Sequence, residues 1–339
     1  MPVPAVSVLL PVHNGASYLE DAVASILRQT LPDFELLVIN DGSTDGTASI
    51  LRNCANSRLT VIENERNLGL IPSLNTGLAA ARGEFVARMD ADDIAYPHRL
   101  QRQVDFLREF PQVGLCGTWF QMFGAGRPKV VRPPTQPEDL AARLFYESPL
   151  AHPSVMFRRA LFADHGLQYS LDYPHAEDYE LWVRAGEITG LANLPEVLLR
   201  YRRHGKQVSN LKTARQNETV RMILVRQLRK IYPGASADEC ERHVAICKEW
   251  LSERAGIDVH YVETWLRQLV ARNDSAGCPF PRDAFRRALG IVWWRYCSVR
   301  LATRGMLSAF YASDFARALP LRNRLGIIAL RAKAMAAPS

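Results

Sequence analysis

Three carboxylates directly follow an apolar stretch in the first third of the chain. Residues 84–89 are typical of a short buried strand, and Asp90, Asp92 and Asp93 come immediately after it. Unpaired acids are costly to bury, so we expect these side chains in a polar cleft at the mouth of the strand. Asp90 and Asp92 flank the small Ala91 and could share one divalent cation that also takes phosphate oxygens. Taken alone, the pattern also fits a solvated turn before the next helix.

A second pair of acids, Glu177 and Asp178, falls in the predicted first turn of a helix over residues 176–184. The positive end of a helix favours an ionised carboxylate, which is the form that a general base requires. A general preference for acids in the first turn of a helix explains the same pair without any catalytic role.

Alternating strands and helices must position these acids. The predicted strands cover 6–10, 34–39, 59–62, 84–89, 152–157 and 197–201, and helices are expected at 17–29, 71–81, 97–110 and 176–184. Ser17, followed three residues later by Glu20, suggests a capping box. The alternation predicts an α/β domain with a mainly parallel sheet flanked by helices.

Polar residues follow three of the predicted strands. They occur in the stretch from Pro11 and Val12 to His13 and Asn14, in the turn that begins at Asp41, and in Asp90-Ala91-Asp92. Because ligands of open α/β sheets bind at the carboxyl ends of the strands, we expect the three segments to face one crevice.

Charge divides the chain into two parts. Positions 1–210 hold 20 Lys/Arg against 24 Asp/Glu, whereas positions 211–339 hold 22 against 11. We therefore expect an α/β domain over 1–210 and a basic, α-helical domain over 211–339. The second part contains no DNA- or RNA-binding motif, so we expect no nucleic-acid partner. Its basic helices, residues 317–333 above all, also suit an anionic membrane surface.

Several observations favour a cytoplasmic protein. The six cysteines are scattered without Cys-x-x-Cys spacing, as expected for reduced thiols. No apolar run is long enough to span a membrane, and the first residues lack the features of a signal peptide.

With these residues in place, the chain resembles the family 2 glycosyltransferases, which are inverting, nucleotide-sugar-dependent enzymes of the GT-A fold. The resemblance covers about residues 5–208. It is carried by five motifs in the family's order: 7–14, 34–45, 67–70, 83–93 and 177–178. The chain lacks the Gln-x-x-Arg-Trp motif and the membrane helices of the processive polysaccharide synthases, which argues against a polymerising enzyme.

The resemblance implies roles for individual residues. Asp178 would be the catalytic base, with Glu177 next in line, and Asp92 and His204 would bind Mn²⁺ or Mg²⁺. The nucleotide sugar, a UDP-sugar by the habit of the family, would contact Pro11, Val12, His13, Asn14, Asp41, Asn67, Asp90 and Ala91. The acceptor would be a glycan or a lipid-linked sugar in bacterial cell-surface polysaccharide or glycolipid synthesis, at the inner face of the plasma membrane.

Other interpretations remain open at the level of sequence. His204 could be an ordinary surface histidine, Asp41 could cap the following helix, and Asn67 could simply shape a loop. A nucleotide-sugar-binding protein without turnover would show many of the same motifs. A sugar-nucleotide pyrophosphorylase would need a glycine-rich, basic loop after the first strand, and residues 13–17 do not supply one.

Overall fold

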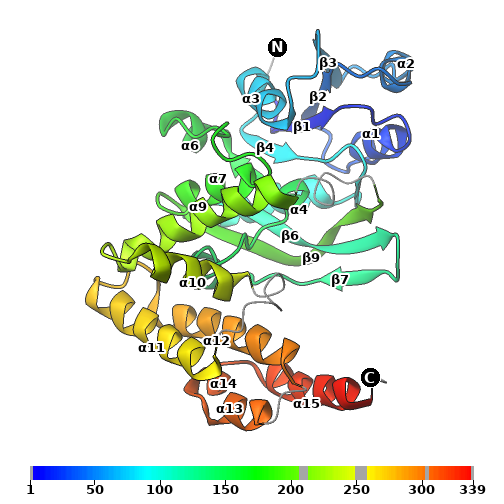
Figure 1. Cartoon of the computed structure of the whole chain (residues 1–339). Coiled ribbons are helices and arrows are strands. Elements are labelled where there is room, and N and C mark those ends of the chain that lie inside the picture. Colours follow the sequence, from blue (N-terminus) through cyan, green and yellow to red (C-terminus); the bar gives the residue numbers. More distant parts are fainter. Residues whose placement is uncertain (1–2, 206–212, 249–257, 302–304, 337–339) are drawn as a thin grey trace. The chain divides into compact units, whose positions relative to one another are not determined.

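The structure is a computed structural model that describes most of the chain, namely residues 3–205, 213–248, 258–301 and 305–336 (Figure 1). The chain divides into two compact units. Unit 1 comprises residues 1–140 and 148–220, and unit 2 comprises residues 141–147 and 221–339. The domain boundary expected after residue 210 falls between 206 and 212, outside the described residues.

Unit 1 is built on a nine-stranded sheet in the order β3-β2-β1-β4-β8-β6-β9-β5, with β7 paired to β6. The strands are β1 (Val6–Val12), β2 (Phe34–Asp41), β3 (Leu59–Asn64), β4 (Phe85–Arg88), β5 (Ile94–Ala95), β6 (Val113–Gly124), β7 (Lys129–Val131), β8 (Met156–Arg158) and β9 (Gly190–Arg203). The first four strands pair in parallel, as do the long strands β6 and β9, whereas β5, β7 and β8 join in antiparallel fashion. The expected mixed, mainly parallel sheet is confirmed.

Helices cover this sheet, because β1, β2 and β4 are mostly apolar and are buried along their whole length. The helices of unit 1 are α1 (Leu19–Leu27), α2 (Thr47–Asn53), α3 (Leu70–Ala80), α4 (Arg99–Glu109), α6 (Arg159–Asp164) and α7 (Glu177–Ala185), and α5 (Pro137–Arg143) begins in this unit. The helix α3 packs on β1 and β2, and α4 packs on β6 and β9.

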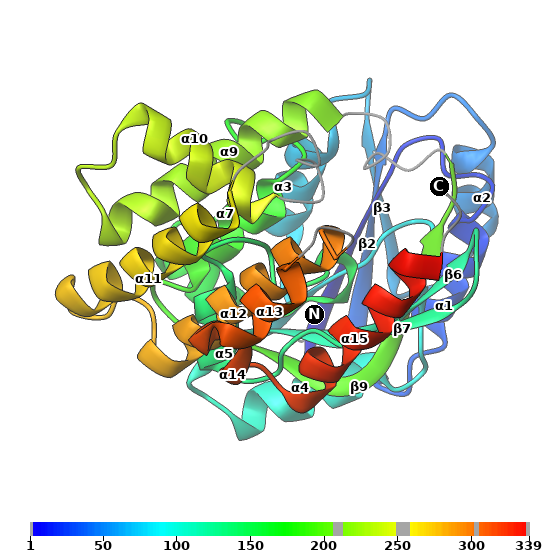
Figure 2. The same cartoon turned by 60° about the horizontal axis from the view of Figure 1, so that its bottom comes forward.

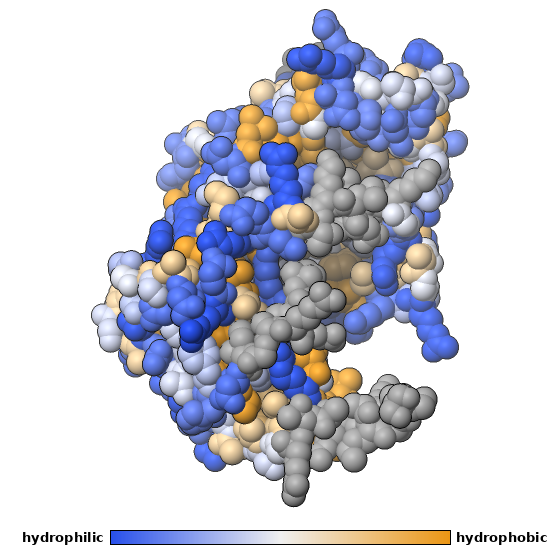
Figure 3. All heavy atoms as spheres, viewed as in Figure 1, coloured by the Kyte–Doolittle hydropathy of each residue, from blue (hydrophilic) through white to orange (hydrophobic). Residues whose placement is uncertain are grey.

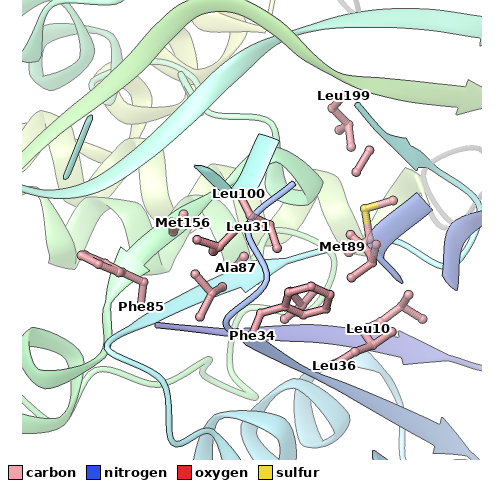
Figure 4. Packing of buried hydrophobic residues seen from close by; sticks show 14 of the residues in the cluster. Leu10, Leu31, Phe34, Leu36, Phe85, Ala87, Met89, Leu100, Met156 and Leu199 are labelled. Carbon is pink, nitrogen blue, oxygen red and sulfur yellow. The ribbon is translucent and has the colours of Figure 1, made fainter. Parts of the chain in front are cut away.

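The core of unit 1 explains where the acidic strand end points. Phe85, Ala87 and Met89 pack in one hydrophobic cluster with residues of β1 and β2 (Figure 4). Because side chains alternate along a strand, Arg88 and Asp90 must face the opposite side of the sheet. Arg88 and Asp90 are thereby placed side by side, and they form an ion pair.

Two local predictions were wrong. Ser17 does not cap the first helix, which begins at Leu19 after a Tyr18 that makes no side-chain cap. Instead, the amides of Tyr18 and Leu19 both donate to the carbonyl of Gly15, so a backbone turn supplies the start. Residues 152–154 form a 3₁₀ turn rather than strand, because Pro153 has no N–H to offer a sheet.

Unit 2 is helical throughout its described part (Figure 2). Its helices are the later part of α9 (Thr213–Ile231), α10 (Ala237–Cys247), α11 (Val259–Ser275), α12 (Arg282–Val299), α13 (Met306–Ala312), α14 (Asp314–Arg317) and α15 (Leu321–Ala336). An aromatic cluster holds the unit together, in which Phe145 contacts Phe280 and Phe285 edge to face. Among the described helices, none is long and apolar enough to cross a membrane.

The turn after β2 depends on a glycine. Gly42 has a φ of +61°, and a Cβ there would lie 2.4 Å from the backbone carbon of Arg66. Gly46 has an ordinary φ, and a Cβ there would lie 3.6 Å from its nearest neighbour, the Cβ of Ala16. We expect Gly42→Ala to lower the free energy of unfolding by about 1–3 kcal/mol, because both the left-handed backbone and the close approach penalise a side chain. Urea titrations should show this loss, with Gly46→Ala as the matched control; equal unfolding free energies would contradict it.

Candidate active site

The three carboxylates after β4 form one cluster. Each of Asp90, Asp92 and Asp93 offers an oxygen within 4.8 Å of the others. The end of β1 comes close to them, because a Cβ added to Gly15 would lie 3.7 Å from that of Ala91. The segment after β1 and the acidic segment after β4 therefore lie side by side.

The end of β9 completes the surroundings of the cluster. Arg202 donates its backbone N–H to Asp93 Oδ1 at 2.7 Å and its Nε–H to the carbonyl of Asp92 at 2.7 Å. His204 Nε2 lies 2.9 Å from Asp92 Oδ2. The structure thus brings together Asp92 and His204, which are 112 residues apart and were expected to share a metal.

Burial makes the negative charge of this cluster costly. Loss of solvent, followed by the charge of Asp90, raises the pKa of Asp92, while His204 opposes the shift. Burial and the charges of Asp90 and Asp92 raise the pKa of Asp93 well above its usual value. Asp93 Oδ2 is buried and has no hydrogen-bond partner. Several oxygens that repel one another, one of them unsatisfied, fit a hard divalent cation such as Mg²⁺ or Mn²⁺.

Arg88 is a buried cation beside the cluster that the sequence analysis passed over. Its Nη2 lies 2.5 Å from Asp90 Oδ1, whereas its Nε and Nη1 are buried without hydrogen-bond partners. Burial opposes the charged form, but the adjacent Asp90 carboxylate outweighs burial and raises the pKa of Arg88. The spacing of two residues along one strand places Arg88 and Asp90 on the same face. No local signal in the sequence distinguishes Arg88 from an ordinary strand residue.

The second acid pair lies at the start of α7. Burial is the main reason that the pKa of Glu177 rises to about 7, and the charge of Asp178 adds to it. Burial also raises the pKa of Asp178, although the N–H of Tyr179 and the charge of Arg88 oppose the rise. The favourable helix end is therefore present, as predicted, but desolvation outweighs it. The charge of Asp90 raises the pKa of Asp178 as well, so the two acidic groups act on each other electrostatically.

The loop before α7 is held by the start of α9. Gln216 donates through Nε2 to the carbonyl of His175 at 2.9 Å, and Thr219 donates through Oγ1 to the carbonyl of Pro174 at 3.0 Å. His175 has a φ of +67°, in the left-handed region that non-glycine residues rarely adopt. The two hydrogen bonds therefore fix an unfavourable turn directly before Glu177 and Asp178.

A neutral histidine and a tyrosine border the same space. His152 Nε2 lies 2.9 Å from Tyr169 Oη, and the His152 ring contacts Trp182 edge to face. Burial holds the pKa of His152 well below its usual value, and the charge of Arg88 acts in the same direction. Burial also raises the pKa of Tyr169. Both side chains are therefore uncharged at neutral pH and share one hydrogen bond.

The ends of β1 and β2 are joined by hydrogen bonds. His13 Nδ1 lies 2.8 Å from the carbonyl of Asp41, and the Asn14 amide donates to Ser43 Oγ at 2.9 Å. Asn14 Oδ1 in turn accepts from the Thr44 amide at 2.8 Å. Asn14 has a φ of +53°, which asparagine tolerates better than most residues. Two of the predicted nucleotide-contacting segments are thus one rigid corner.

The carboxylate of Asp41 has a structural role that was not predicted from the sequence. It accepts hydrogen bonds from Asn64 Nδ2, the Leu68 amide and the Gly69 amide, at 2.7 to 2.9 Å. It therefore acts at the start of α3, whereas α2, the next helix, has Gly46 as its N-cap.

The remaining predicted nucleotide contacts differ in exposure. Pro11 and Val12 are buried within β1, where they pair with Ile39 and Asn40 of β2. Asn67 is exposed, and its backbone nitrogen would lie 2.5 Å from a Cβ at Gly42.

Two solved structures share this fold. The structure of S. aureus TarS 1–349 in complex with UDP-GlcNAc matches with a TM-score of 0.59 and 20% identity, covering 90% of this chain and 88% of that one. The mannosyltransferase PcManGT from Pyrobaculum calidifontis, in complex with GDP-Man and Mn²⁺, matches with a TM-score of 0.52 and 20% identity, covering 95% and 88%. The sheet and its acidic strand end therefore define an α/β protein of the GT-A type.

Sequence relatives give the family. Residues 7–166 match the family described as Glycosyl transferase family 2. An uncharacterized glycosyltransferase of Haemophilus influenzae is 34% identical over 232 residues, which are 65% of this chain and 72% of that protein. The amylovoran biosynthesis glycosyltransferase AmsE of Erwinia amylovora is 32% identical over 203 residues, or 58% and 75%. The chain belongs to glycosyl transferase family 2.

The raised pKa of Glu177 predicts a pH-dependent gain in stability from Glu177→Gln. Between pH 4.5 and about 7 the folded state holds a proton that the unfolded state releases, so wild-type stability falls as pH rises through this window. At pH 8 the variant should unfold with a free energy higher by about 3 kcal/mol, because the pKa of Glu177 rises from 4.5 to about 7 on folding, and at pH 4 it should match wild type. Urea titrations in EDTA at both pH values measure this.

The exposed Glu20 provides the matched control, because Glu20→Gln should change neither value. If the Glu177→Gln variant is less stable than wild type at pH 8, ionised Glu177 does not destabilise the folded state, and the prediction is wrong.

Proposed function

We propose that the protein transfers a sugar from a nucleoside diphosphate sugar to an acceptor hydroxyl, with inversion at the anomeric carbon. The observation that carries the proposal is the pairing of two acidic groups in unit 1. Asp90, Asp92 and Asp93 could bind a cation, and Asp178 could act as the base. The charge of Asp90 raises the pKa of Asp178. Departure of a diphosphate needs the first group, and activation of a hydroxyl needs the second.

The donor would lie across the carboxyl ends of β1, β2 and β4. In this proposal His13, Asn14 and Asp41 shape the site for base and ribose, together with the backbone of Pro11 and Val12. Asp90, Ala91 and Asn67 would approach the diphosphate. The TarS and PcManGT structures are complexes with UDP-GlcNAc and GDP-Man, so both bases are candidates, and we place UDP-sugars first because they are common donors in the family.

Asp92 and His204 would hold Mn²⁺ or Mg²⁺, with Asp90 beside them. When bound, such a cation supplies positive charge to the departing diphosphate. The chemistry of the residues supports this assignment, since carboxylate and imidazole groups are accepted ligands of Mn²⁺. The GDP-Man complex of PcManGT contains Mn²⁺.

Asp178 would accept the proton of the acceptor hydroxyl. The hydroxyl oxygen then bonds to the anomeric carbon as the bond from that carbon to the diphosphate oxygen breaks, and the nucleoside diphosphate leaves. Burial moves the pKa of Asp178 towards the working pH, which improves a base, while the charge of Arg88 keeps the ionised form accessible. Glu177 is the alternative base.

The acceptor would be a glycan or a lipid-linked sugar in polysaccharide or glycolipid synthesis. The name of AmsE connects that relative to amylovoran biosynthesis. We also propose that the enzyme works at the anionic, cytoplasmic surface of a membrane, because lipid-linked acceptors reside there.

A donor screen tests the proposed function. Purified protein with Mn²⁺ or Mg²⁺ should release nucleoside diphosphate from one member of a panel of nucleotide sugars when a suitable acceptor is present. NMR of the product should show a β-linkage from an α-linked donor. A retained configuration would exclude the single-base displacement.

Metal removal should stop turnover. Excess EDTA should abolish activity, and Mn²⁺ or Mg²⁺ should restore it, because the acid cluster alone repels a diphosphate. Asp92→Asn should lose most activity and weaken donor binding, measured by calorimetry, whereas the exposed Asp105→Asn should not. Full activity in EDTA would contradict the proposed metal site.

Removal of the base should separate binding from chemistry. We expect Asp178→Asn to lower kcat by about 10²–10⁴, the usual contribution of a positioned base, while donor affinity stays near that of wild type. Stopped-flow or product-release kinetics together with donor calorimetry measure both quantities. If Glu177→Gln shows the larger loss in kcat, the base is Glu177 instead.

A further inference from the structure

The helix α15 in unit 2 exposes a stripe of apolar side chains. Leu321, Leu325 and Ile328 are 60%, 55% and 50% exposed. Their spacing of four and three residues places them within about 60° of one another on the helix. Figure 1 draws this helix at the C-terminal end of the chain, and Figure 3 shows the molecule from the same side. We call these three residues the α15 stripe.

The α15 stripe is not the side by which the helix is attached to unit 2. Ile327 is fully buried and lies on another face of the same helix. The helix packs on α12, and the Tyr311 hydroxyl donates to the carbonyl of Arg324 at 2.5 Å. The helix thus carries one apolar face for the fold and a second one that the described part of the chain leaves open. Isolated exposed leucines are common, but three in one stripe on an already anchored helix are not explained by folding.

The charge of α15 indicates what covers the stripe. Its sequence holds Arg322, Arg324, Arg331 and Lys333 and no acidic residue. The helix therefore combines an exposed apolar stripe with four basic residues among its sixteen. An apolar stripe on a basic helix matches the boundary of an anionic bilayer, where acyl chains and phosphates meet. The helix is not long and apolar enough to cross the bilayer, so it would lie along the surface.

We propose that the α15 stripe inserts into the interface of an anionic membrane and so attaches the protein to it. This deepens the proposed membrane location by naming the contact, and it rests on that location alone, not on the donor or the chemistry. Each basic residue near the surface adds attraction to anionic lipid, and each aliphatic side chain adds burial in the acyl region.

Vesicle co-sedimentation tests this attachment. Full-length protein should bind vesicles of phosphatidylcholine mixed with phosphatidylglycerol, and bind vesicles of pure phosphatidylcholine more weakly. High salt should weaken binding to the mixed vesicles. The triple variant Leu321→Ser, Leu325→Ser, Ile328→Ser should lower the partition coefficient at least about tenfold, because three half-exposed aliphatic side chains no longer enter the bilayer.

A matched control replaces three exposed apolar residues outside α15, namely Leu171→Ser, Ile188→Ser and Met222→Ser, and should bind vesicles like wild type. Urea titrations should show that both triple variants remain folded. Glycosyl transfer to a soluble acceptor, measured in parallel, reports the proposed activity separately from attachment.

Two results would overturn the proposal. One is vesicle binding that the α15 triple variant leaves unchanged, or no binding by wild type at all. The other is self-association: light scattering that shows a wild-type dimer which the α15 variant converts to monomer, without vesicle binding, would assign the stripe to a second copy of this chain.

Discussion

The candidate active site depends on the repulsion among three carboxylates that follow one short strand and are partly buried. Asp92 and Asp93 have raised pKa values because burial and neighbouring charges both oppose their ionisation. Arg88 neutralises part of this charge through Asp90 but leaves an oxygen of Asp93 unsatisfied. Such a cluster favours the binding of a cation. A divalent cation bound together with a diphosphate would relieve the repulsion and bring the substrate with it.

The surrounding fold keeps this short strand in place. The strand β4 has four residues, and its start is held where the Gly83 amide donates to Ser7 Oγ at 2.8 Å. Ser7 in turn donates to the buried Glu35 at 2.6 Å, and Arg82 pairs with the same carboxylate. At the other end, Arg99 is fully buried and donates to the carbonyl of Arg88 at 2.7 Å. The acids can therefore stay close despite their repulsion, since the backbone that carries them is fixed at both ends.

Sequence reasoning succeeded where local pattern decides the outcome. The apolar runs of β1, β2 and β4 and the acids that follow β4 were found from residue type alone, because buried parallel strands need continuous apolar residues. It failed where a distant partner decides. In the sequence, Arg88 looks like an ordinary strand residue until its burial beside Asp90 is known. The hydrogen bonds of Asp41 to the segment before α3 involve residues 23 to 28 positions away. The turn at 152–154 was predicted as strand because the residues that follow it are apolar. The pairing of Asp92 with His204 came from family resemblance, since no local signal connects residues so far apart.

The most direct test of the central claim is equilibrium binding of Mn²⁺, followed by electron paramagnetic resonance, with and without UDP or GDP. If the carboxylate cluster binds the cation and the diphosphate as a unit, one of the two nucleotides should tighten Mn²⁺ binding about tenfold or more, and Mn²⁺ should tighten binding of that nucleotide by the same factor. This mutual effect should disappear in Asp92→Asn. Mn²⁺ binding that is indifferent to both nucleotides and to the loss of Asp92 would contradict the account.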